Sequence, residues 1–257
     1  MSRLALTFEC QGCQLAGTLD TAPGKTGLLI ISGGNELRSG AFSGQSQLAA
    51  RIAASGFPVF RFDRRGVGDS DGENRGFASS RKDIAAAMDA FRAMCPQMDS
   101  VVAFGNCDAA SALMLSGGEG CDALILSNPW TFDEGEEKPD SAAIRSRYSA
   151  KLKNPKELIR LITGKIDLGK LLRGLRDSFR PAYDTSSLAR DMESGVSRFD
   201  GPVRFLLAMN DRTAQAFEQN WAHDDKRIER CNGASHAYVE PDAAEWLEKQ
   251  ILSFLRS

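Results

Sequence analysis

Residues 101–115 read Val-Val-Ala-Phe-Gly-Asn-Cys-Asp-Ala-Ala-Ser-Ala-Leu-Met-Leu, and the rest of the chain can be placed around them. The apolar run 101–104 predicts a short buried strand, and the alanine-rich run from Ala109 predicts a helix. The link between them, from Gly105 to Ala109, has the form small-x-cysteine-x-small. A sharp strand-to-helix turn leaves no room for large side chains at its flanking positions, so Cys107 is expected to stand clear of the sheet.

This position suits a nucleophile. Free N–H groups and the positive end of the helix dipole lie at a helix N-terminus, and both favour a thiolate. The N–H of Asp108 would then point at a developing oxyanion. The alternative is an inert buried cysteine, because free cysteine is among the most buried residue types.

Strands and helices alternate on both sides of this link. An antiparallel hairpin is predicted within residues 4–19, followed by buried strands at 27–32, 57–62, 123–126 and 202–208 with helices between them and a last helix ending near 255. This alternation predicts an α/β fold with a mostly parallel, doubly wound sheet. We expect residues 1–130 and 198–257 to form the core domain, with 131–197 inserted as a helical cap.

The expected cap is basic, because residues 144–180 contain eleven Lys or Arg against three Asp or Glu. Such a run is commonly a solvated face, here next to an acidic stretch at 133–140. The alternatives are recognition of an anionic acyl donor, such as a phosphate-bearing carrier, and peripheral contact with an anionic membrane surface.

A nucleophilic cysteine needs a base, and the base needs an orienting acid. Of the two histidines, His236 lies in a small-residue loop before the last helix, whereas His223 lies in a polar stretch and is expected to be merely exposed. Asp211 follows the strand at 202–208 and is the expected acid, with Asn210 as a weaker substitute. The order nucleophile, acid, histidine is the one that this type of fold uses.

The second oxyanion donor is expected in the glycine turn 32–35, after the strand at 27–32. Glycine lets the backbone approach a substrate, so the N–H of Gly34 is the first choice and that of Asn35 the next. A plain glycine turn is the alternative. A dinucleotide site is disfavoured because the third glycine of the G-x-G-x-x-G pattern is missing.

The composition of the chain also bears on nucleic-acid binding, location and cofactors. A chain of 257 residues with a formal charge of −2 gives no indication of nucleic-acid binding. No signal peptide or membrane-spanning run is recognisable, and six cysteines without framework spacing suit reduced thiols, so the cytoplasm is the expected location. The Cys10-x-x-Cys13 pair lacks a second pair or nearby histidine, and neither metal nor cofactor is expected.

These motifs together resemble a known family. Five segments of this chain are similar to the first of two α/β-hydrolases associated with the exosortase A system. They are the glycine turn 33–35, Arg-Phe-Asp-Arg-Arg-Gly-Val-Gly-Asp-Ser at 61–70, Gly-Asn-Cys-Asp-Ala-Ala-Ser at 105–111, Asn-Asp-Arg-Thr at 210–213 and the loop of His236. The resemblance spans about 4–130 and 200–257. It implies an α/β-hydrolase fold and a Cys-His-Asp triad in a bacterium that makes exopolysaccharide, but it implies no particular substrate.

The first functional hypothesis is an acyl hydrolase, an esterase or thioesterase, that works through an acyl-Cys107 intermediate. The second is an acyltransferase to a carbohydrate or another acceptor, with water excluded by the cap. The third is a hydrolase-like binding protein whose basic cap docks a partner. The sequence does not indicate an oligomeric state.

Overall fold

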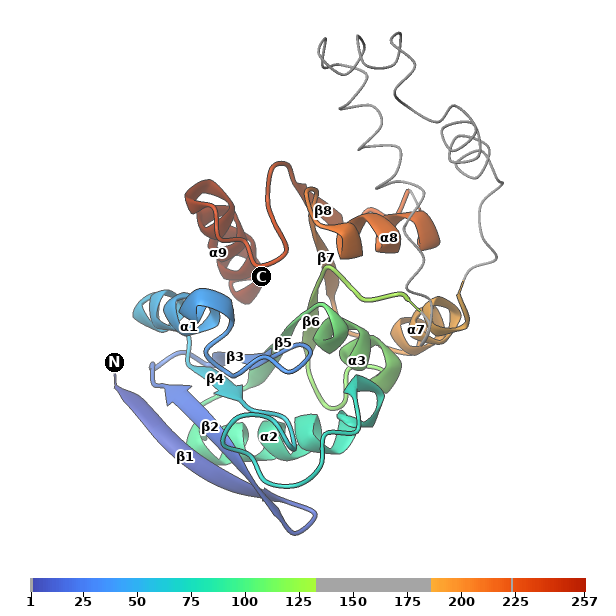
Figure 1. Cartoon of the computed structure of the whole chain (residues 1–257). Helices are drawn as coiled ribbons and strands as arrows, with labels where there is room; N and C mark the ends of the chain where they lie inside the picture. Colours follow the sequence, from blue (N-terminus) through green and yellow to red (C-terminus); the bar gives the residue numbers. More distant parts are fainter. Residues whose placement is uncertain (1, 133–185, 223) are drawn as a thin grey trace, which may run out of the picture. The chain divides into compact units, whose positions relative to one another are not determined.

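A computed structural model describes residues 2–132, 186–222 and 224–257 of the chain. Most of the expected cap, including its basic run, and His223 lie outside these residues. Within the described part, an eight-stranded sheet has the order β1-β2-β4-β3-β5-β6-β7-β8 (Figure 1). The strands are β1 (Arg3–Cys10), β2 (Cys13–Asp20), β3 (Thr26–Ile31), β4 (Val59–Phe62), β5 (Ser100–Asn106), β6 (Ala123–Ser127), β7 (Val203–Ala208) and β8 (Ile228–Cys231).

The direction of the strands confirms the expected fold class. β1 pairs with β2, and β2 with β4, in antiparallel fashion, whereas every later pair is parallel. The hairpin turns at Gln11 and Gly12, where both residues have positive φ angles of 52° and 78°. Such a two-residue turn matches the twist of the strands that it joins.

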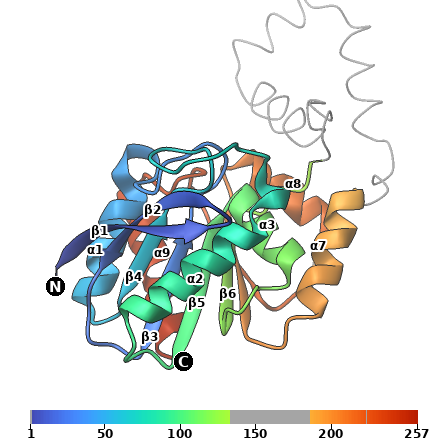
Figure 2. The same cartoon turned by 90° about the horizontal axis from the view of Figure 1, so that it is seen from below.

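Helices cover both faces of the sheet (Figures 1 and 2). The core splits accordingly, since Val101 and Ala103 of β5 join one cluster of buried residues and Val102 and Phe104 join the other. The first cluster lies under α2 (Arg81–Met94), α3 (Asp108–Ser116), α7 (Ser187–Ser197) and α8 (Arg212–Asn220), and the second under α1 (Gly44–Ala54) and α9 (Pro241–Leu255).

Helix α7 differs from the expectation, which placed it in the cap. Met192 and Val196 are buried in the first cluster, and the backbone of Gly195 lies so close to α3 that a Cβ there would be 1.9 Å from the carbonyl oxygen of Met114. Residues 1–131 and 187–257 form one compact unit. The core therefore resumes at 187 rather than at 198, because α7 buries its apolar face on α3. The rest of the cap assignment stays a prediction.

Every predicted site residue follows a strand of the parallel part of the sheet. The glycine turn follows β3, Cys107 follows β5, Asp211 lies three residues after β7, and His236 lies in the loop after β8. Carboxyl ends of parallel strands share one edge of a sheet, which is where ligands bind in open α/β sheets. The topology thus brings these segments to one edge.

Candidate active site

Cys107 lies at the sharp turn between β5 and α3. It has φ 61° and ψ −129°, a conformation that costs a residue other than glycine about 1–3 kcal/mol. A Cβ on Gly105 would lie 2.7 Å from the carbonyl carbon of Ala109, so only glycine fits there. The turn therefore holds the backbone of Cys107 in a strained conformation.

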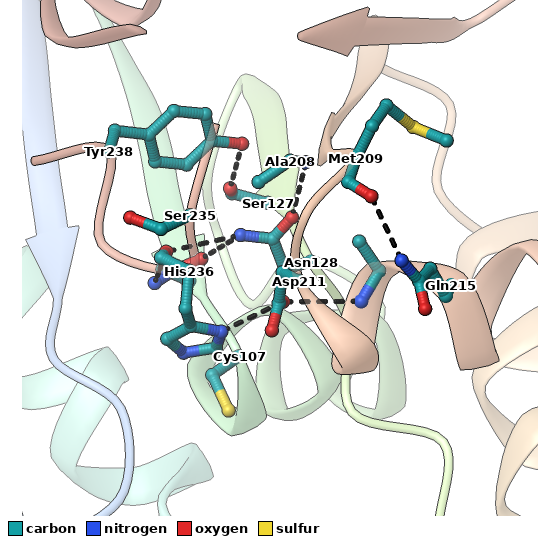
Figure 3. A network of polar contacts seen from close by, with 12 residues as sticks. Cys107, Ser127, Asn128, Ala208, Met209, Asp211, Gln215, Ser235, His236 and Tyr238 are labelled. Atoms are coloured by element: carbon teal, nitrogen blue, oxygen red, sulfur yellow. Dashed lines mark hydrogen bonds and ion pairs between the residues drawn. The ribbon is translucent and has the colours of Figure 1, made fainter. Parts of the chain in front are cut away.

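Cys107 also differs from the other thiols in its surroundings. All six cysteines are free, and four of them are buried. Burial raises the pKa of each of these four thiols, in the case of Cys121 to about 12, which makes them poor nucleophiles. They are Cys10, Cys95, Cys121 and Cys231. Cys107 and Cys13 remain partly exposed, and Cys107 lies beside a histidine (Figure 3).

His236 is held by Asp211. The Nδ1 atom of His236 lies 2.8 Å from Oδ2 of Asp211, whose side chain is 9% exposed. Asp211 is also the N-cap of α8, where it accepts a hydrogen bond from the N–H of Ala214 at 3.2 Å. Because Nδ1 faces the carboxylate, Nε2 is left for the cysteine (Figure 3).

Two acceptors act on this imidazole. The hydrogen bond to Asp211, followed by the interaction with Cys107, raises the pKa of His236 from its ordinary 6.5 to about 10, against an opposing effect of burial. The imidazolium is therefore the stable form at neutral pH. A charged imidazole beside a sulfur stabilises a thiolate, which is the nucleophilic form of cysteine.

Asn128, which was not among the residues predicted for the site, joins three parts of the site through hydrogen bonds of its side chain. This residue follows β6 with a φ of 43° and is fully buried. Its Nδ2 donates to Oδ1 of Asn106 at 2.9 Å and to the carbonyl oxygen of His236 at 3.3 Å, while its Oδ1 accepts from the N–H of Ala208 at 2.8 Å (Figure 3). These hydrogen bonds join the strand-to-helix turn at Cys107, here called the elbow, to β7 and to the loop of His236.

The glycine turn lies against the elbow. A Cβ on Gly33 would be 2.7 Å from the carbonyl oxygen of Asn106, which explains the need for glycine. The N–H of Gly34, the expected second oxyanion donor, donates to Oδ1 of Asp108 at 2.6 Å. The two predicted oxyanion residues are thus neighbours, but one donor is engaged by the side chain of the other. The N–H of Asp108 opens α3 and has no acceptor within the helix.

Arg64, which lies in the 61–70 motif, completes this arrangement. Its side chain is 5% exposed and forms an ion pair with Asp108 at 3.4 Å. The guanidinium also donates to the carbonyl oxygen of Gly34 and to Oγ of Ser80. A buried cation therefore balances the Asp108 carboxylate beside the expected oxyanion site.

Asn210 and Asn35, the two weaker candidates from the sequence, form hydrogen bonds outside the contact between His236 and Asp211. Asn210 donates to the carbonyl oxygen of Gly233 at 2.9 Å and so supports the histidine loop, while the acid facing His236 is Asp211. The side chain of Asn35 accepts from Asn74 at 2.7 Å, and its use as an oxyanion donor stays a prediction. The described residues contain no group of His, Cys, Asp and Glu that could hold a metal ion, and no helix among them is long and apolar enough to cross a membrane.

Known proteins resemble this chain in sequence profile and in fold. Residues 28–249 match the sequence profile of the Alpha/beta hydrolase family. No curated protein sequence matches the chain.

Solved structures share the fold at low identity. The esterase Pf2001 from Pyrococcus furiosus superimposes with a TM-score of 0.60 at 15% identity, covering 99% of this chain and 90% of that one. XC6422 from Xanthomonas campestris, described as an a/b serine hydrolase without lid, gives 0.59 at 15% identity, covering 100% and 94%. A thioesterase domain from the curacin biosynthetic pathway gives 0.59 at 14% identity, covering 98% and 100%.

Proposed function

Because this chain belongs to the alpha/beta hydrolase family, we propose that it is an acyl hydrolase that cleaves an ester or a thioester through a Cys107, His236 and Asp211 triad. The observation that carries the proposal is the hydrogen bond between His236 and Asp211 beside Cys107, at a strand-to-helix turn whose backbone is strained at the cysteine. The esterase and thioesterase folds named above support the same reaction class.

In the acylation step the Cys107 thiolate attacks the carbonyl carbon, and a C–S bond forms while the carbonyl oxygen becomes an oxyanion. The intermediate then collapses as the bond to the leaving oxygen or sulfur breaks. The His236 imidazolium gives its Nε2 proton to that leaving atom, and Asp211 keeps the ring oriented through Nδ1. An alcohol or thiol departs, and an acyl-cysteine remains.

In deacylation, His236 is neutral and takes a proton from water, whose oxygen attacks the acyl carbon. The C–S bond breaks and the acid leaves, so the thiolate and imidazolium are restored. The sum of both steps is the addition of one water across the substrate bond. A thiolate leaves a tetrahedral intermediate more readily than an alkoxide does, so this half of the reaction depends on how well His236 activates water.

Oxyanion stabilisation is assigned to the N–H groups of Asp108 and Gly34. The Gly34 donor bonds to the Asp108 carboxylate in the free protein, so a substrate oxygen has to take that donor over. Arg64 can hold the displaced carboxylate, because it already pairs with it. The proposed link to exosortase A and exopolysaccharide systems is supported by the sequence resemblance at 105–111 and the other quoted motifs.

The proposal is tested by acyl-enzyme trapping. Incubation with 4-nitrophenyl acetate and with an acyl thioester, followed by rapid acid quench and intact-mass spectrometry, should give a burst of leaving group and one added acyl group, which peptide mapping places on Cys107. Absence of both a burst and any acyl group on Cys107, or acylation spread over surface side chains, would refute the covalent mechanism. Turnover that requires an added carbohydrate alcohol would replace hydrolysis by acyl transfer to that acceptor.

A further inference from the structure

A cavity of about 300 Å³ adjoins the site on the side of the sheet covered by α1 and α9. Asn106, immediately before the nucleophile, and Ala237, immediately after the histidine, both line it. Apolar walls come from Leu48 of α1, Phe104 of β5 and Leu247 of α9. A mostly apolar cavity of this size with a few convergent polar groups is typical of a small-molecule subsite.

Glu36 places a carboxylate in this cavity. Its Oε1 accepts from the N–H of Ala41 at 2.7 Å, and its Oε2 accepts from Nε2 of Gln45 at 3.1 Å. Among the described residues, no lysine or arginine forms an ion pair with this half-buried carboxylate. A partly desolvated carboxylate that lacks a lysine or arginine partner gains from a further hydrogen-bond donor or a positive charge on a ligand.

The pKa of Glu36 is affected by residues of the proposed catalytic site. Burial raises the pKa of Glu36 above its ordinary value, with a smaller rise from the charge of Asp108. The N–H of Ala41 and the charge of His236 act in the opposite direction. Glu36 is therefore close enough to Asp108 and to His236 for the charges of these two residues to act on its carboxylate.

The other charged residue of the cavity does not offset Glu36. Arg51 lines the cavity, but its guanidinium pairs with Glu248 at 2.6 Å. Phe42 and Val239 are lining residues too, and their side chains are 85% and 51% exposed, so they form an open apolar rim. Exposed apolar groups beside a carboxylate-bearing cavity suit a ligand with an aliphatic part and a polar end.

We propose that this cavity receives the part of the substrate remote from the scissile bond, and that Glu36 selects a short aliphatic chain ending in a hydrogen-bond donor, either an ammonium or a hydroxyl group. The inference rests on the proposed hydrolase function and deepens it by naming a substrate class. A chain ending in a carboxylate is rejected, because two like charges would face each other in a partly desolvated space. Glu36 is thereby a specificity-determining residue.

Binding can be tested without any turnover. Ligand-observed NMR titrations would compare hexylammonium, 1-hexanol and hexanoate with the parent protein, with Glu36→Gln and with Glu9→Gln, a control at an exposed acid on β1. We expect the parent to bind hexylammonium and hexanol at least fivefold more tightly than hexanoate. The Gln variant keeps an acceptor but loses the charge, so it should lose affinity for hexylammonium more than for hexanol, while the Glu9 control matches the parent.

A second variant locates the binding. Ala244 lines the cavity from α9, and Ala244→Phe should fill it and weaken all three ligands. A loss confined to hexylammonium in Glu36→Gln indicates an amine-bearing substrate, whereas tighter parent binding of hexanol than of hexylammonium indicates an alcohol. Equal affinity for the three ligands, or binding that survives Ala244→Phe, would overturn the inference.

The corresponding 4-nitrophenyl esters connect the cavity to catalysis. The 6-aminohexanoate or 6-hydroxyhexanoate ester should exceed the adipate monoester in kcat/KM by at least fivefold, and Glu36→Gln should remove most of this preference. Selective ligand binding without acylation of Cys107 would contradict the proposed hydrolase function but keep the donor-selective cavity. Acylation of Cys107 without any selectivity among the esters or ligands would contradict the role of Glu36 alone.

Discussion

Replacing Cys107 with alanine is expected to abolish ester and thioester cleavage. Removal of the nucleophile of a triad costs up to about 10⁶-fold in kcat, and we expect a loss of at least about 10³-fold in kcat/KM here. The stability of the fold should change little, because Cys107 is partly exposed and its strained backbone is the same for alanine. Steady-state kinetics and thermal unfolding of the same samples measure both effects.

The matched control for this variant is Cys13→Ala. Cys13 is the other partly exposed thiol, and it lies at the hairpin of β1 and β2. Its replacement should leave kcat/KM within about twofold of the parent, because surface substitutions away from a site have small effects. Equal activity of the Cys107→Ala variant and the parent would remove Cys107 from the mechanism.

Replacing Asp211 with asparagine should give the second largest loss, about 10²–10⁴-fold in kcat/KM, because the base loses the partner that fixes its tautomer and stabilises its charge. Asparagine is as good a helix N-cap as aspartate, so α8 keeps its cap. Kinetics of Asp211→Asn and of Asn210→Ala would be compared. A larger loss in Asn210→Ala than in Asp211→Asn would reverse the assignment of the acid.

The same variant has a signature in the pH dependence of stability. The pKa of His236 is raised from 6.5 to about 10 in the folded protein, chiefly by Asp211. The stabilisation from this pair is therefore complete below pH 6.5 and is lost as the pH rises through about 10. In urea unfolding, the stability advantage of the parent over Asp211→Asn should shrink across that range. An advantage that grows toward pH 10 would contradict the assigned direction.

Much of the fold could be predicted because its signals are local. Gly105 and Ala109 flank the cysteine within five residues, and the alternation of strands and helices repeats along the chain. Those signals were enough to predict that Cys107, Asp211 and His236 would lie at one edge of the sheet.

The remaining features depend on contacts between distant residues. Asn128 reads as the end of a strand, and only the tertiary structure brings its amide to Asn106 and Ala208. Arg64 belongs to a turn with an ordinary structural explanation, yet its guanidinium reaches Asp108 at a separation of 44 residues. No sequence period encodes such pairings, because each joins a single side chain to a single remote partner.

The central claim is that Cys107 is a nucleophile activated by His236, and its most direct test is the pH dependence of Cys107 alkylation. Iodoacetamide labelling followed by intact-mass spectrometry would be run on the parent and on His236→Ala across the pH range. We expect fast labelling of Cys107 well below pH ~8.5, the reference value for a free thiol, and slower labelling in the His236 variant. Slow labelling that follows an ordinary thiol titration and is indifferent to His236 would contradict it.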